Sequence, residues 1–174
     1  MRRLVLLAAA VLFAVSVWAQ QPIDTDFTQV RHLKMSGKTT DKAGHITFDG
    51  KDQLSMIYTE PEGEFFIVEG DRVKMNLNGK KAEMDASKVK LVKLQRATLL
   101  NCLAGHWEQA AVDNNAETTV DEANGFRHVF IKAKGKVPRG GYNSVDLMYR
   151  LSDGALVKMV LEEAVGVINT YEIK

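Results

Sequence analysis

The side chains able to perform catalysis or to hold a metal are few and widely separated along this sequence. The four histidines are His32, His45, His106 and His128, and no two of them stand at the spacing of metal ligands. Cys102 is the only cysteine, so it has no CxxC partner and cannot form an internal disulfide. The pattern predicts neither a metal site nor a cofactor.

Two short motifs have the residue types of a reactive site. Gly-His-Trp-Glu places His106 and Glu108 two positions apart, but we interpret them as polar groups of a solvated loop. Cys102 lies in a leucine-rich segment and is better interpreted as a small buried apolar residue than as a nucleophile. Gly140-Gly141 lacks the rest of a phosphate-binding loop, and no Gly-x-Ser-x-Gly elbow is present. We therefore predict that the protein is not an enzyme.

The N-terminus has the order of a secretory signal. Arg2 and Arg3 precede an uncharged apolar run over residues 4–17, and Val17 and Ala19 fit the −3 and −1 positions of a cleavage site. The run is shorter than the ~20 residues that a membrane-spanning helix needs, which argues against an uncleaved anchor. We predict a signal peptide over residues 1–19, one domain over residues 20–174, and an exported protein that is soluble after cleavage.

Overall charge gives no sign of a nucleic-acid partner or of an anionic membrane. The chain has 23 Lys and Arg against 22 Asp and Glu, and removal of Arg2 and Arg3 with the signal leaves the two signs nearly equal. No cysteine stands directly after the apolar run, so the mature N-terminus would carry no lipid on a cysteine.

Most of the remaining sequence consists of short β-prone runs separated by Gly, Asn or Asp turns, which predicts about ten strands. Asn78-Gly79 is a strong hairpin signal because both positions tolerate positive φ. The short connections favour antiparallel pairing, and a sheet of this size tends to curl. The runs cover residues 27–35, 45–48, 54–58, 65–69, 73–77, 81–84, 117–121, 126–133, 145–151, 156–162 and 165–173.

One segment changes to a helical period. Apolar residues spaced by three and four predict one main helix over about residues 87–104, with Asp85 or Ser87 as its N-terminal cap and Gly105 at its end. Residues 106–115 fit either a short helix or a loop. Lys88, Lys90, Lys93 and Arg96 form a basic stripe, which suits a solvated face better than a contact with an anionic head group.

Several strands are apolar on both faces, so the sheet needs cover on both sides. One helix cannot provide it, and either a ligand, a second chain or curvature of the sheet around its own interior must do so. Six methionines in the strand runs would suit a cavity for variable acyl chains, although ordinary core packing explains each of them as well.

In order and spacing, five motifs resemble the outer-membrane lipoprotein carrier proteins, the LolA family, in their short Bacteroidetes-type form. They are the opening Phe27-Thr28-Gln29, the strand before Pro61, the Glu69-Gly70 hairpin, the Asp153-Gly154 hairpin and the closing strand over residues 169–173. The family's N-terminal helix has no counterpart in residues 20–26, and Lys51-Asp52 replaces its usual Arg-Pro.

The resemblance implies a mainly β fold, in which a single curved antiparallel sheet forms an unclosed β-barrel and the helix covers a hydrophobic cavity. It implies a monomeric carrier in the periplasm that binds the acyl chains of lipoproteins. An inner-membrane ABC-type lipoprotein-releasing transporter would load it, and an outer-membrane acceptor would unload it. Two alternatives stay open: another lipid cargo, such as a phospholipid or lipid-linked pigment, or an envelope interaction or regulatory domain whose own side chains fill the cavity.

Twelve inward-facing apolar residues are the predicted acyl-chain contacts. Nine come from strands and three from the helix: Leu54, Met56, Phe66, Val68, Val73, Met75, Leu147, Met159 and Leu161, with Leu91, Leu94 and Leu99.

Overall fold

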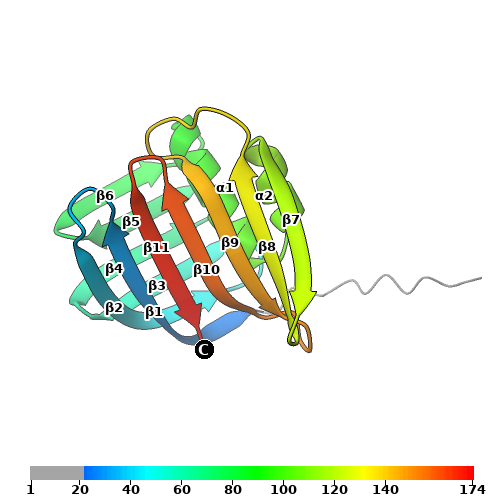
Figure 1. Ribbon diagram of the computed structural model, residues 1–174. Coiled ribbons are helices and arrows are strands. Elements are labelled where there is room, and N and C mark those ends of the chain that lie inside the picture. Colours follow the sequence, from blue (N-terminus) through cyan, green and yellow to red (C-terminus); the bar gives the residue numbers. More distant parts are fainter. Residues whose placement is uncertain (1–21) are drawn as a thin grey trace, which may run out of the picture.

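The computed structural model describes residues 22–174, so the predicted signal peptide lies outside the described residues (Figure 1). Eleven strands and two helices follow one another along the chain. The strands are β1 (Ile23–Leu33), β2 (Thr39–Phe48), β3 (Gln53–Glu60), β4 (Glu62–Glu69), β5 (Arg72–Leu77), β6 (Lys80–Asp85), β7 (Ala116–Ala123), β8 (Phe126–Ala133), β9 (Tyr142–Arg150), β10 (Leu156–Glu163) and β11 (Val167–Ile173), and the helices are α1 (Lys90–Leu103) and α2 (Trp107–Asp113).

All eleven strands belong to one antiparallel sheet in the order β6-β5-β4-β3-β2-β1-β11-β10-β9-β8-β7. Strand β1 joins its two halves by pairing with β2 on one side and with β11 on the other, where Phe27 lies opposite Ile173. The edge strands β6 and β7 do not pair with each other, while the sheet curls around both helices (Figure 1). The predicted mainly β, unclosed barrel with a covering helix is therefore confirmed.

Alternation along the strands separates the two faces of the sheet. Val145, Leu147 and Tyr149 of β9 are buried, while Asp146 between them is exposed, as the period of two predicted. The runs that are apolar on both faces have no second layer outside, and Ile57 on the outer face of β3 is 45% exposed. Of the three ways to cover these apolar strands, the structure uses curvature of the sheet around its own interior, and the outer faces of the strands stay uncovered.

The covering helix begins three residues later than predicted. Val89 is its N-terminal cap and provides no side-chain hydrogen bond. Asp85 and Ser87 do not cap it, because the Asp85 carboxylate instead accepts hydrogen bonds from the Ser87 amide and hydroxyl, at 3.0 and 2.5 Å. Gly105 follows the last turn with φ +77°, as its type predicted.

Of the two alternatives for residues 106–115, the short helix is confirmed, because residues 107–113 form helix α2 with His106 as its cap. The interpretation of Gly-His-Trp-Glu as a solvated loop is therefore wrong. Strand β1 ends at Leu33, and Met35 lies in the turn that follows it, not in a strand.

Candidate functional site

The inner face of the sheet and helix α1 enclose one apolar core, which contains most of the predicted acyl-chain contacts. Eight of the twelve are buried in it: Leu54, Met56, Val68, Val73, Leu99, Leu147, Met159 and Leu161. Phe66 and Met75 are half-buried and pack against it, whereas Leu91 and Leu94 lie half-exposed on α1. That these residues contact a ligand stays a prediction.

Side chains fill the space between the sheet and α1. Leu99 and Leu103 of the helix reach Phe27, Ile46 and Met56 of the sheet, and the gap that remains there has no room for a water molecule. In the conformation described, an acyl chain could enter this region only if the helix moved away from the sheet.

Open space lies instead at one end of the barrel, in a pocket of about 580 Å³. It is formed by the starts of β1 and β8, the end of β11, the β9–β10 hairpin and the corner between α1 and α2. The apolar part of its wall includes Ile23, Leu103, Trp107, Leu156 and Val157. A volume of this size falls in the range of about 300–1,000 Å³ for small-molecule sites.

The pocket also has charged groups of both signs among its lining residues. Arg150 forms an ion pair with Asp153 at 2.7 Å across the β9–β10 hairpin, and Arg127 forms one with Glu122 at 2.7 Å. Apolar surface beside charged groups suits an amphiphilic molecule, whose chain leaves water while its polar head stays in it.

None of the twelve predicted residues lines this pocket. It is assembled from five segments that are distant in the sequence, so no local period indicates it. The one available signal was Trp107, a large aromatic side chain within the Gly-His-Trp-Glu motif.

Beside the pocket, the Tyr149 hydroxyl donates a 2.7 Å hydrogen bond to the Cys102 carbonyl and so ties α1 to β9. Burial raises the pKa of the Cys102 thiol to about 12, and the thiolate is the nucleophilic form. Cys102 is thus held neutral near pH 7. Within residues 22–174 no group of His, Cys, Asp or Glu is placed to hold a metal ion, and no helix is long and apolar enough to cross a membrane.

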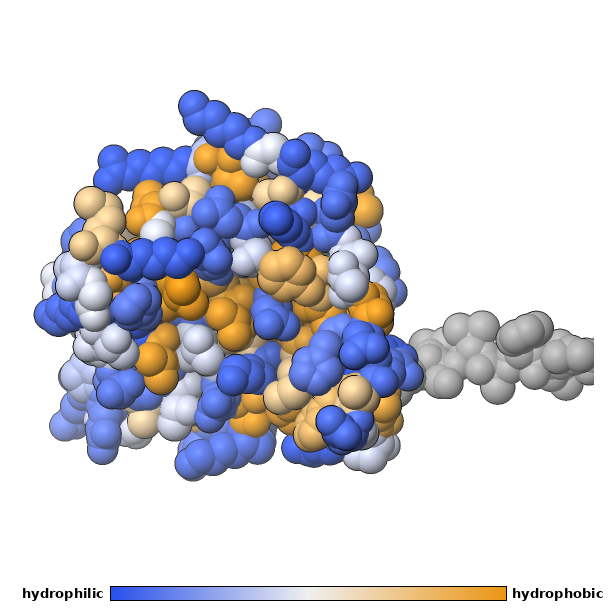
Figure 2. Space-filling model, viewed as in Figure 1, coloured by the Kyte–Doolittle hydropathy of each residue, from blue (hydrophilic) through white to orange (hydrophobic). Residues whose placement is uncertain are grey.

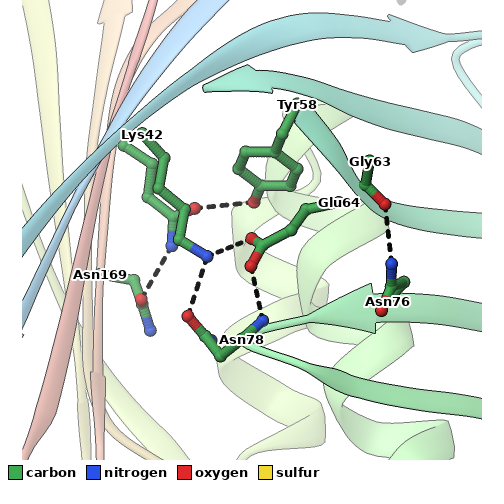
Figure 3. Close-up of polar contacts among 8 residues, drawn as sticks. Lys42, Tyr58, Gly63, Glu64, Asn76, Asn78 and Asn169 are labelled. Atoms are coloured by element: carbon green, nitrogen blue, oxygen red, sulfur yellow. Dashed lines mark hydrogen bonds and ion pairs between the residues drawn. The ribbon is translucent and has the colours of Figure 1, made fainter. Parts of the chain in front are cut away.

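The opposite end of the interior is polar. The Lys42 ammonium, whose side chain is only 2% exposed, contacts a Glu64 carboxylate oxygen and donates a 2.9 Å hydrogen bond to the Asn78 side-chain carbonyl (Figure 3). The Asn78 amide donates in turn to the other Glu64 oxygen at 2.7 Å. This arrangement closes the β5–β6 hairpin over the ion pair.

A second chain of hydrogen bonds crosses the middle of the sheet. The Tyr58 hydroxyl donates to Gln29 at 2.7 Å, Gln29 donates to Asn169 at 2.9 Å, and Asn169 donates to Glu163 at 3.0 Å. Across the described part of the chain, no buried side-chain nitrogen or oxygen lacks a hydrogen-bond partner. A satisfied network of this kind favours one arrangement of β1, β3 and β11.

Glu163 should make the network sensitive to pH. Burial raises the pKa of its carboxyl, which Arg31 and Asn169 partly offset, so the folded state disfavours the charged form. We expect Glu163→Gln to increase the free energy of unfolding near neutral pH, while the new amide still accepts the Asn169 hydrogen bond. The gain should disappear as the pH falls below the ordinary glutamate pKa of about 4.3.

Urea unfolding of both proteins across this pH range measures the difference. Glu117→Gln on exposed strand β7 removes the same charge without the burial and serves as the control. A gain that is equally large in acid would contradict this explanation.

No family model matches the chain, and no curated protein matches it. Several solved structures are similar in fold. A LolA superfamily protein from Nitrosomonas europaea is 9% identical with a TM-score of 0.40, and the match covers 89% of this chain and 84% of that one. A putative outer membrane lipoprotein-sorting protein domain from Vibrio parahaemolyticus is 9% identical with a TM-score of 0.37, covering 87% and 83%.

The complex of MucA and MucB from Pseudomonas aeruginosa contains a third similar chain, 10% identical with a TM-score of 0.46, and the match covers 89% of this chain and 51% of that one. At such identities the likeness concerns the course of the backbone alone.

Proposed function

We propose that this chain is a periplasmic, non-enzymatic carrier that binds the acyl chains of lipoproteins and takes them from the inner to the outer membrane. The observation that carries the proposal is the pocket of about 580 Å³ that opens directly onto the apolar core. Leu103 and Ile173 line the pocket and also belong to the core, so an acyl chain that enters the pocket meets the side chains that fill the barrel.

The energetics agree with such a role. Burial of each CH₂ group contributes about 0.8 kcal/mol, so one long chain brings a large gross gain from which the cost of association is subtracted. Release would then need a partner that binds the chain at least as well. In the proposed cycle an inner-membrane ABC-type transporter loads the carrier and an outer-membrane acceptor unloads it.

A phospholipid or lipid-linked pigment presents the same apolar chemistry and is the alternative cargo. A second candidate function, an envelope interaction domain without a ligand, is favoured by the filled space between α1 and the sheet. Native mass spectrometry of the protein purified from its host separates the three. Acylated peptide supports the lipoprotein carrier, free lipid supports the alternative cargo, and a ligand-free protein that binds no acyl probe contradicts both.

The pocket itself can be tested with a fluorescent fatty acid. Val157→Arg places a charge in the pocket wall, and we expect it to weaken binding at least about tenfold, equivalent to losing contact with two CH₂ groups at about 0.8 kcal/mol each. The matched control is Val112→Arg, at a valine of α2 that is 73% exposed and outside the pocket. If both variants bind the probe like the unchanged protein, the acyl site is not this pocket.

A further inference from the structure

Three connections meet at the end of the barrel opposite the pocket. They are the β1–β2 turn (residues 34–38), the β8–β9 loop (residues 134–141) and the β10–β11 turn (residues 164–166). Backbone hydrogen bonds join them: the Lys34 amide donates to the Gly166 carbonyl, and the Ala164 amide donates to the Gly141 carbonyl, both at 2.9 Å. The three segments therefore form one continuous surface, which we call the basic end.

The charge of the basic end has a single sign. Its segments contain five cations, Lys34, Lys38, Lys134, Lys136 and Arg139, and no aspartate or glutamate. Lys34 forms an ion pair with Glu162 at 2.6 Å. The other four cations are exposed and form no ion pair with any residue that the structure describes. The chain as a whole is nearly neutral, so this is a local concentration of positive charge.

Apolar side chains project from the same surface. Met35, at the tip of the β1–β2 turn, is 95% exposed, and Val165 in the neighbouring turn is 38% exposed. Figure 2 shows hydrophilic side chains projecting along this edge of the molecule with hydrophobic residues between them. The core does not use Met35, so its exposure costs hydrophobic free energy unless another surface covers it.

We propose that the basic end docks on a bilayer surface that contains anionic phospholipids. Its lysines and arginine would lie against the head-group phosphates, and Met35 and Val165 would enter the interface between them. A protein partner fits less well, because a stable protein interface needs a contiguous, well-packed apolar centre. Here the apolar side chains stand at separate turn tips among cations, an arrangement that a fluid head-group layer can accommodate.

The docked orientation leaves the pocket accessible. The basic end lies at the end of β1 and the start of β11, whereas the pocket lies at the start of β1 and the end of β11. A molecule held on a membrane by the basic end would thus direct its pocket away from that membrane.

Flotation with phosphatidylcholine vesicles, with and without phosphatidylglycerol, tests the proposal. We expect the protein to bind better to the vesicles with phosphatidylglycerol, and added salt to weaken that binding. The variant Lys134→Gln, Lys136→Gln, Arg139→Gln should bind anionic vesicles about 100-fold more weakly, since each cation near such a surface contributes about fivefold. Met35→Ser should weaken binding while keeping its salt dependence.

The control is Lys51→Gln, Arg72→Gln, Lys88→Gln, which removes the same charge from exposed positions away from this end of the barrel. Because all variants share the same N-terminus, any contribution of residues 1–21 is common to them. Equal losses in the two triple variants, or equal binding of the unchanged protein to both kinds of vesicle, would overturn the proposal. Binding of the fluorescent fatty acid should be the same in both triple variants, which keeps this test separate from that of the carrier function.

Discussion

Replacement of Gly44 by alanine is expected to lower the free energy of unfolding by about 3 kcal/mol, at the upper end of the usual cost of overpacking. Gly44 lies in β2 between Phe27 of β1 and Tyr58 of β3. A Cβ added there would come within 2.4 Å of the Ile57 carbonyl oxygen and 2.9 Å of the Tyr58 Cα. Both are backbone atoms of the neighbouring strand, so they cannot turn away as a side chain would.

The missing side chain also makes room for an aromatic contact. The Phe27 ring lies over Gly44 and meets the Tyr58 ring edge-on, with centroids 5.2 Å apart. Alanine would push this ring aside as well, since its Cε1 lies 2.9 Å from the added Cβ. This is a strand glycine that permits close approach, as such glycines often do.

Urea unfolding and thermal melting measure the effect, and the melting temperature should fall by roughly 10 °C for a chain of this size. Gly135→Ala is the control, because no atom lies within 4 Å of its added Cβ and its backbone needs no positive φ. If the two alanine variants unfold at the same urea concentration, the close approach at Gly44 does not limit stability.

The local features of this fold could be predicted from the sequence because each rests on neighbouring residues. The Asn78-Gly79 and Asn124-Gly125 pairs have positive φ and close hairpins, as their residue types indicate. Strand β8 has the predicted bounds of residues 126 and 133. Turn chemistry and a period of two are sufficient for such elements.

Features that depend on distant partners could not be predicted in this way. The predicted run began at Phe27, yet residues 23–26, Ile-Asp-Thr-Asp, extend β1 by pairing with the end of β2, where Asp24 and Asp26 also bind His45 at 2.7 and 2.9 Å. The predicted start of α1 was wrong because an aspartate at this position can either cap a helix or accept hydrogen bonds within a turn. The Asp85 carboxylate accepts the Ser87 amide in a turn, and the helix begins later.

The candidate site also combines local features, which the sequence indicates, with features that depend on distant segments, which it does not. Alternation indicated the inward face of β9, and eight of the twelve predicted contacts lie in the core. Whether a core holds empty space depends on how far the helix sits from the sheet, which no pattern encodes. Leu99 and Leu103 fill the centre, and the open volume lies where five chain segments meet at one end.

Removal of the buried cation at the other end should have an equally large effect. Lys42→Met leaves the Glu64 carboxylate, whose side chain is 12% exposed, without its ammonium partner. Breaking a buried pair by removing one member typically costs 3–5 kcal/mol, and we expect a loss of about 3 kcal/mol in the free energy of unfolding. The substitution also removes the hydrogen bond from the ammonium to Asn78 and the contact of the ammonium with the Tyr58 ring, whose centre lies 5.3 Å away.

The double variant Lys42→Met, Glu64→Gln separates the unpaired charge from the other losses. Its glutamine oxygen can still accept the Asn78 amide proton, so most of the loss should be recovered and the two substitutions should be strongly non-additive. Urea unfolding of the two single variants and the double variant completes the cycle.

Lys74→Met provides the comparison at the surface. Lys74 pairs with Glu69 at 2.9 Å, but the two side chains are 33% and 50% exposed, so its loss should cost no more than about 1 kcal/mol. If Lys42→Met costs no more than Lys74→Met, water reaches Glu64 and the β5–β6 hairpin does not seal this end of the barrel. A large cost at Lys42 alone would mean that this end is closed by a desolvated ion pair. An apolar chain would then have its easier entry at the pocket end.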